Sequence, residues 1–246
     1  METNYLENNY LALVGKVTSD KIFSHEIYGE KFYVFDLSVP RLSGNADIIP
    51  VTISERLLTS DTLRLERNLR IEGQFRSYNS YEGERSRLVL TVFAKEVEEL
   101  EDGEIEPSKD LITNEVTLKG FVCKEPIYRK TPFGREIADL LMAVNRAYGK
   151  SDYIPIIAWG RNARYCENLP VGSEIKIVGR IQSRKYEKKH EDGTIETKVA
   201  YEVSAGSLAI INIKEKDEME DSEGVSGDET VDNQIENTTQ ESKEVI

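Results

Sequence analysis

Two stretches of the sequence carry side chains suited to a flat, negatively charged ligand. In residues 152–160, Tyr153 and Trp159 lie an even number of positions apart. Side chains alternate between the two faces of an extended strand, so both rings share one face with Pro155 and Ile157. The opposite face is aliphatic and consists of Ile154, Ile156 and Ala158. This strand therefore combines an apolar inner face with an aromatic outer face.

In residues 174–186 the two faces of the predicted strand differ more clearly in chemical character. By the same alternation, Ile175, Ile177 and Ile181 point to one face. The opposite face carries Lys176, Arg180, Gln182, Arg184 and Tyr186. Aromatic rings stack on nucleobases, and cations attract phosphates. Single-stranded nucleic acid fits such a face.

The net charge of −13 is compatible with this ligand because the charge is unevenly distributed. Residues 112–213 carry 16 basic and 12 acidic side chains, whereas residues 214–246 carry 3 basic and 12 acidic ones. Residues 95–111 are also acidic, with 8 carboxylates and 2 cations. Local charge decides where an anion binds, so residues 112–213 form the candidate binding surface.

Several other classes of protein are disfavoured. No apolar run approaches the roughly 18 residues of a membrane helix, and the N-terminus lacks the features of a signal peptide. Two cysteines, Cys123 and Cys166, make neither a metal cluster nor a disulfide framework, which fits a cytoplasmic, nucleoid-associated protein. His25 and His190 have no neighbouring ligands, and no catalytic motif is present. We expect no enzymatic activity, no metal or other cofactor, and no membrane association.

An internal repeat divides the chain into two copies of one domain. With a shift of 105 positions, residues 9–53 align with residues 114–158 without a gap. The identical pairs are Asn9/Asn114, Leu13/Leu118, Gly15/Gly120, Val17/Val122, Ile22/Ile127, Gly29/Gly134, Val39/Val144, Arg41/Arg146, Asp47/Asp152, Ile49/Ile154 and Pro50/Pro155. Residues 71–73 likewise resemble residues 177–179 after a small insertion. A period this long indicates tandem domains rather than a solenoid.

Each copy has the alternating pattern of an all-β fold. In the second copy, five alternating stretches predict strands, and residues 161–168 predict a short helix that ends near Pro170. Asp192 and Gly193 indicate a hairpin turn before the last strand. Five strands with a helix after the third fit a small closed barrel of the OB type. We predict two tandem five-stranded OB-fold barrels, each with a short helix.

The predicted domain boundaries follow from the repeat and the composition. They give a first OB-fold domain at residues 1–100, an acidic linker at 101–111, a second OB-fold domain at 112–213 and a tail at 214–246. The tail is acidic and polar and contains no aromatic residue. Such a composition buries too little apolar area to offset the entropy cost of ordering. We therefore expect the tail to be disordered.

Four separated motifs stand out in the second copy: NEVTLKG at 114–120, ADLLMAVNR at 138–146, IIAWG at 156–160 and GRIQSRKY at 179–186. In this order and spacing they resemble the bacterial single-stranded DNA-binding protein family over about residues 112–211. The resemblance implies OB barrels that wrap single-stranded DNA without sequence preference. It also implies four barrels acting together, which two chains would supply as a homodimer.

The resemblance further implies recruitment of replication and repair proteins through an acidic tail with a Pro-Phe tip. The tail of this chain ends in Ile246 instead, which puts recruitment by that route in doubt.

The family stacks bases on aromatic side chains at four places. The resemblance assigns these places to Tyr148, Tyr153, Trp159 and Tyr186. In the first copy the positions equivalent to the first three are Ser43, Ile48 and Ser54, and only Tyr78 and Tyr81 lie near the fourth. We expect the first copy to keep the fold and to have lost much of the ligand face.

Cations near these rings are the predicted phosphate contacts: Arg146, Arg161, Arg180, Arg184, Lys185 and Lys188. For any one of them a solvated surface charge is the alternative, and for Tyr153 and Trp159 the alternative is the barrel core. Taken together, these features predict sequence-independent single-stranded DNA binding in replication, recombination and repair. The alternative is an OB-fold interaction module of a replication or recombination complex with vestigial DNA binding.

Overall fold

The computed structural model describes residues 8–82, 85–108, 110–189 and 193–214, and most of these residues lie in β-strands. The predicted all-β fold is confirmed. The strands of the first half are β1 (Asn9–Val17), β2 (Ile22–Ile27), β3 (Glu30–Pro40), β4 (Ala46–Ser54), β5 (Asn68–Glu82) and β6 (Arg85–Glu99). Those of the second half are β7 (Asn114–Val122), β8 (Ile127–Lys130), β9 (Glu136–Asn145), β10 (Ser151–Trp159), β11 (Glu174–Lys189) and β12 (Ile195–Asn212).

Strand pairing closes each half into a ring of five strands. In the first half β1 pairs with β3 and β5, β3 with β4, β4 with β6 in parallel, and β6 with β5. In the second half β7, β9, β10, β12 and β11 repeat this circuit. We call these rings the first and the second barrel. The short strands β2 and β8 pair with β3 and β9 outside the rings.

The interior of each barrel is aliphatic, as the alternation of the strands predicts. Leu13, Leu37, Ile49 and Ile71 are completely buried in the first barrel, and so is their neighbour Val92. Their counterparts in the second barrel are Leu118, Met142, Ile154, Ile177 and Val203, which are also completely buried. Burial of such side chains contributes about 1.5–3 kcal/mol each, which makes these two cores the main source of stability.

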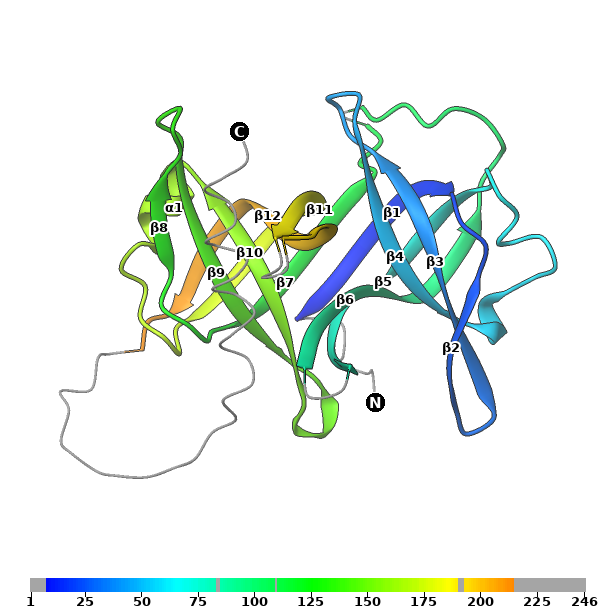
Figure 1. Ribbon diagram of the computed structural model, residues 1–246, viewed down its shortest axis with the longest axis horizontal. Helices are drawn as coiled ribbons and strands as arrows, with labels where there is room; N and C mark the ends of the chain where they lie inside the picture. Colours follow the sequence, from blue (N-terminus) through cyan, green and yellow to red (C-terminus); the bar gives the residue numbers. More distant parts are fainter. Residues whose placement is uncertain (1–7, 83–84, 109, 190–192, 215–246) are drawn as a thin grey trace.

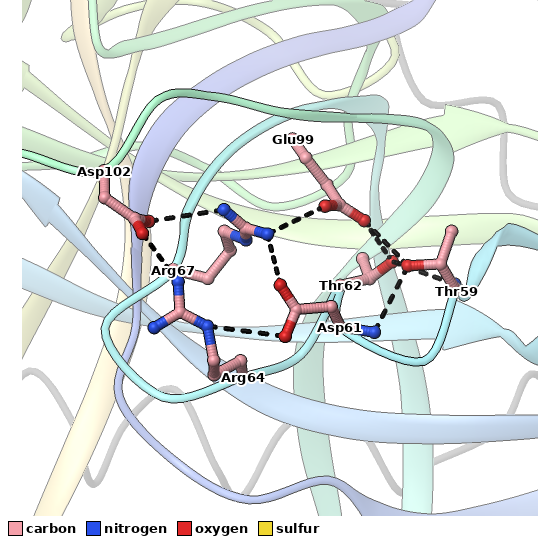
Figure 2. A network of polar contacts seen from close by, with 7 residues as sticks. All are labelled: Thr59, Asp61, Thr62, Arg64, Arg67, Glu99 and Asp102. Atoms are coloured by element: carbon pink, nitrogen blue, oxygen red, sulfur yellow. Dashed lines mark hydrogen bonds and ion pairs between the residues drawn. The ribbon is translucent and has the colours of Figure 1, made fainter.

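The first half lacks the α-helix that the sequence predicts for each copy. Between β4 and β5 the described chain has only the 3₁₀ turn η1 (Glu55–Leu57) and a loop. In this loop the Thr59 and Thr62 hydroxyls bond to each other and accept from the backbone N–H groups of Asp61 and Thr59, respectively (Figure 2). Arg64 and Arg67 join this loop to Asp102, and Arg64 Nη2 lies 2.7 Å from its carboxylate. Such local side-chain bonds compete with helical bonding. In the second half the prediction is confirmed by α1 (Arg161–Cys166).

The two barrels lie side by side with β1 and β7 between them (Figure 1). These two strands pair antiparallel, with Leu11 opposite Val116. The segment that connects the halves returns to this junction, where the Val14 N–H donates to the Thr113 carbonyl at 2.8 Å. The twelve strands therefore form one continuous sheet across both barrels.

The asparagine that both copies share connects the first strand of each barrel to a neighbouring strand, β5 in the first barrel and β11 in the second. Asn9 exchanges two hydrogen bonds with the backbone of Phe75, at 2.8 and 2.9 Å. Asn114 does the same with the backbone of Ile181, at 2.7 and 2.9 Å. The amide side chain thus extends the contact between the two strands beyond the point where their backbones pair.

No helix in the described part of the chain is long and apolar enough to cross a membrane. The predicted disordered tail falls almost entirely on residues 215–246, which lie outside the described residues.

Candidate nucleic-acid interface

The outer face of β10 presents two aromatic rings. Tyr153 is 37% exposed and Trp159 is 38% exposed, whereas Ile154, Ile156 and Ala158 are buried. The expected alternation is therefore correct for the two rings, and neither belongs to the barrel core. Ile157 departs from the expectation because it is only 6% exposed. It lies mid-strand between two neighbouring strands, β9 and β12.

Beyond the barrel, β11 and β12 continue as a two-stranded arm, residues 182–189 and 195–202, which we call the second arm. Arg184 and Tyr186 lie on it, with the Arg184 guanidinium carbon 5.9 Å from the centre of the Tyr186 ring. Lys185 is exposed, while Tyr186 and Lys188 are half-buried. The two strands stay paired as far as Lys189 and Ile195, as the predicted hairpin requires, and Asp192 lies outside the described residues.

Two further predicted residues lie at the ends of the aromatic strand. Tyr148 is in the 3₁₀ turn η2 (Ala147–Gly149), immediately before β10, and its side chain lies outside the described part of the structure. Arg161 is exposed and begins α1 directly after Trp159 and Gly160.

For Arg146 the structure shows a role in joining the two halves. Its Nε donates to the buried carboxylate of Asp152 at 2.7 Å, its Nη2 donates to the same carboxylate, and Nη2 also donates to the Ser77 carbonyl at 2.6 Å. Ser77 belongs to the β5–β6 hairpin of the first half. Its N–H donates to Asp152 at 2.6 Å, and its Oγ accepts from the Tyr153 N–H at 2.7 Å. This interdomain contact compensates the charge of Arg146.

The equivalent residues of the first half make the same kind of contact with the second half. Arg41 pairs with the buried Asp47, and that carboxylate accepts from the Ser183 N–H of the second arm at 2.7 Å. Arg180 Nη1 lies 3.6 Å from Asp47. Burial, followed by the nearby charge of Arg41, lowers the pKa of Arg180, and the carboxylate only partly offsets this shift. Arg180 is thus placed beside a carboxylate of the other half, and it is less available to a phosphate than the sequence suggests.

One carboxylate on this face was not anticipated from the sequence. Glu202 on β12 is only 9% exposed and lies opposite Gln182 on β11, whose Nε2 donates to it at 2.6 Å. Burial raises the pKa of Glu202, and Asp139 raises it further, while the bond from Gln182 and the charges of Arg184 and Arg129 lower it. The sequence signal existed, because Glu202 has the same parity as the outward residues of its strand.

A second feature missed from the sequence lies on the outer face of the first barrel. The Phe93 ring on β6 has two cations over it: Arg76 Cζ at 5.0 Å and Lys95 Nζ at 5.1 Å from the ring centre. Alternation would have placed Phe93 outward, but its position is not one of the four that the family resemblance assigns. It therefore received no weight in the sequence-based interpretation.

The fold and the outward rings define a protein of the OB class with an aromatic and basic face. A model of the single-strand binding protein family matches residues 113–211. The single-stranded DNA-binding protein of Oceanobacillus iheyensis is 33% identical over 118 residues, which cover 45% of this chain and 71% of that protein. The chain belongs to the single-strand binding protein family.

Two further similarities extend this result. The single-stranded DNA-binding protein of Clostridium tetani is 39% identical over 88 residues, or 33% of this chain and 59% of that protein. The chain spans 56–60% of the length of this and two other curated relatives. The structure of the wild-type single-stranded DNA binding protein from Thermus aquaticus superposes with a TM-score of 0.63, covering 89% of this chain and 96% of that one. At 18% identity this similarity concerns the fold.

Proposed function

We propose that this protein binds single-stranded DNA without sequence preference and protects it in replication, recombination and repair. The observation that carries the proposal is the outward placement of Tyr153 and Trp159 on one rigid strand, each more than one third exposed. Every nucleobase has a π-face, so stacking on such rings tolerates any sequence. The curated relatives that the chain matches are named single-stranded DNA-binding proteins, which does not favour an interaction module with vestigial DNA binding.

In this proposal, four aromatic residues stack on bases: Tyr148, Tyr153, Trp159 and Tyr186. Phosphates are contacted by Arg161, Arg184, Lys185 and Lys188, because these cations lie next to the rings and, in the described structure, outside the interdomain contacts. Arg146 and Arg180 act indirectly, by holding the two halves at a fixed distance. Each stacked base contributes about 1–3 kcal/mol. Release of counterions from the phosphates adds a term that weakens with rising salt.

The proposed assembly is a homodimer, so that four barrels line one DNA path. The domains would be residues 1–100 and 112–213, with a linker at 101–111 and a tail at 214–246 that contacts replication or repair proteins. We place the protein in the cytoplasm, at the nucleoid, and assign it no enzymatic activity. Light scattering on the purified chain tests the assembly, since a dimer has twice the mass of 28.0 kDa, and a mass of one chain would refute it.

Trp159 is the single tryptophan of the sequence, so its fluorescence reports directly on the proposed face. Titration with an oligothymidylate should quench it strongly, and the affinity should fall steeply as salt is raised. Unchanged fluorescence together with unchanged anisotropy of a labelled oligothymidylate would refute the proposal.

Substitution gives the sharper test. Trp159→Ala should weaken binding of the labelled oligothymidylate by about 1–3 kcal/mol. Tyr165→Ala is the matched control, because Tyr165 is also an exposed aromatic residue, 56% exposed, but it lies on α1 and not on the strand face. Equal losses in the two variants would show that the effect is not specific to this face.

A further inference from the structure

The outer face of the first barrel carries a row of aromatic rings with cations at one end. His25 on β2 stacks on Phe32 of β3, with ring centres 4.8 Å apart and planes 7° from parallel. Phe32 contacts Phe93 of β6 at 5.8 Å. Arg76 of β5 and Lys95 of β6 lie over the Phe93 ring. We call these five residues the Phe93 cluster.

Strand register shows how this cluster relates to the second barrel. Trp159 of β10 lies opposite Ile137 of β9, and the equivalent pair in the first barrel is Ser54 opposite Phe32. On the other side of the central strand, the second barrel has Ser204, at the position equivalent to Phe93. In the second barrel the large ring, Trp159, is thus on β10. In the first barrel the rings are on β3 and β6, the two strands that pair with β4.

The exchange is sterically consistent. Thr52 and Ser54 on β4 have small side chains, so Phe32 and Phe93 can meet above that strand. In the second barrel Ile157 and Trp159 fill the same space. The first barrel therefore keeps one half-buried ring, Phe93, beside the buried Phe32, although position-by-position comparison finds none at Ser54.

The charge around the Phe93 cluster is positive. Arg76 faces Arg146 and Asp152 of the second half, and Asp152 is already paired with Arg146. Arg76 Nη2 donates to Gln74 Oε1, and Arg76 Nε is buried without a hydrogen-bond partner in the described structure. Arg76 therefore attracts a phosphate through its charge and not through this buried N–H. Lys95 is exposed. An anionic group at this point would meet two cations over one ring.

A carboxylate near the other end of the ring row is neutralised. Glu30 lies beside Ser54, to which it is hydrogen-bonded, and Arg56 Nη2 pairs with Glu30 at 3.0 Å. His25 Nδ1 shares a hydrogen bond with Ser24 Oγ at 2.9 Å. Glu30 therefore adds little repulsion of a phosphate.

The Phe93 cluster also adjoins the candidate face of the second barrel. Arg76 precedes Ser77, whose Oγ accepts the hydrogen bond from the Tyr153 N–H at 2.7 Å. Tyr153 is one of the two exposed rings of β10. The Phe93 cluster thus lies one residue along β5 from the interdomain contact that holds Tyr153.

We propose that the Phe93 cluster is a second site for single-stranded nucleic acid, in which a base stacks on the Phe93 ring while phosphates lie against Arg76 and Lys95. One strand then runs from this site past the interdomain contact to Tyr153 and Trp159. The inference rests on the proposed function, because it takes the same ligand. It replaces the expectation that the first copy has lost much of its ligand face.

The test uses the full chain with two residues exchanged for their counterparts in the second barrel. Phe93→Ser introduces the residue found at Ser204, and Arg76→Gln introduces the one found at Gln182, so the fold has already accommodated both. Arg70→Gln is the matched control, because it also removes a cation from β5, where Arg70 pairs with Glu72 at 3.1 Å. Circular dichroism and the thermal transition verify that each variant is folded.

Binding is measured with labelled oligothymidylates of about 10 and about 30 nucleotides, since one OB fold occupies roughly 4–16 nucleotides. The Phe93→Ser/Arg76→Gln variant should bind the long oligonucleotide at least about tenfold more weakly, keep wild-type affinity for the short one, and keep full quenching of Trp159. A similar loss on both lengths would also support the site and would make it the stronger of the two.

Wild-type affinity of this variant for the long oligonucleotide, with Arg70→Gln also unchanged, would overturn the second site. If Trp159→Ala still weakens binding, the proposed function survives that result. If the wild-type chain binds neither oligonucleotide, the proposed function fails, and the second site fails with it.

Discussion

The contact between Asp47 and the second arm predicts that the two halves unfold together. The Asp47 carboxylate is completely buried, accepts from Arg41 Nε at 2.6 Å and accepts from the Ser183 N–H at 2.7 Å. Ser183 lies 136 positions further along the chain. Asp47→Asn keeps the shape of the side chain, removes its charge, and turns an N–H group toward either Arg41 or Ser183.

The expected cost follows from the burial of the pair. Removing one partner of a buried ion pair costs about 3–5 kcal/mol. The Arg41 side chain is 27% exposed, so water can solvate part of the abandoned charge. We therefore expect Asp47→Asn to lower the free energy of unfolding by about 2–3 kcal/mol. Ser183→Ala removes only the 3.2 Å hydroxyl bond to Asp47 and should cost about 1 kcal/mol or less.

Urea unfolding followed by two signals measures the coupling. Asp47 lies in the first half, whereas Trp159 fluorescence reports on the second half. Far-UV circular dichroism reports on both halves. In Asp47→Asn both transitions should move to lower urea by the same amount. Asp20→Asn, an exposed aspartate of the first half, changes the net charge equally and should move neither.

Two results would refute this reasoning. A lower midpoint by circular dichroism with an unmoved Trp159 transition would show that the halves unfold independently. Unmoved transitions in both signals would show that the buried pair does not stabilise the fold.

Three further predictions follow from single positions. Gly179→Ala should lower the melting temperature strongly, since a Cβ there would lie 2.2 Å from the Ser204 carbonyl oxygen, and wild-type stability would contradict that packing. Burial raises the pKa of Glu202, so protonation favours folding, and this stability is full below the ordinary glutamate pKa and is lost as pH rises through the raised one. Glu202→Gln should therefore be more stable than wild type at neutral pH, with a difference that shrinks in acid, and a pH-independent difference would refute the assignment. Burial raises the pKa of Cys123 and Cys166 to about 11, so a thiol reagent at neutral pH should label the folded chain slowly and the urea-unfolded chain rapidly.

The local elements could be predicted because their physical causes are local. Alternation of aliphatic and polar residues placed Ile175, Ile177 and Ile181 inside and Tyr153 and Trp159 outside, and the structure agrees. Burial of a strand face depends on the sequence of that strand alone, once one face meets a core. The loop that replaces the helix in the first half also bonds to Glu99 and Asp102, which are distant in sequence. No local pattern reveals these bonds.

The role of Arg146 was open to prediction from the repeat. Arg41/Arg146 and Asp47/Asp152 are identical in both copies, including the copy whose aligned ligand positions lack aromatic residues. A cation kept where the ligand rings are absent indicates a structural partner, and here that partner is a carboxylate six positions away. The contacts of Ser77 and Ser183 with the opposite half could not be predicted, because a contact across more than 60 residues leaves no periodic signal in either strand.

On the proposal of a second site, the first barrel has relocated its ligand ring, and comparison by position detects a lost group more readily than a relocated one. A ligand meets the surface of a sheet, and that surface is shared by neighbouring strands whose side chains exchange space with one another. When Ser54 replaces the ring found at Trp159, the space above β4 becomes available to Phe32 and Phe93, which come from other strands. Alignment records the serine and cannot record the compensation, since Phe93 aligns with a serine of its own, Ser204. Phe93→Ser therefore separates the two interpretations: a face without function loses nothing by it, and a relocated face loses its ring.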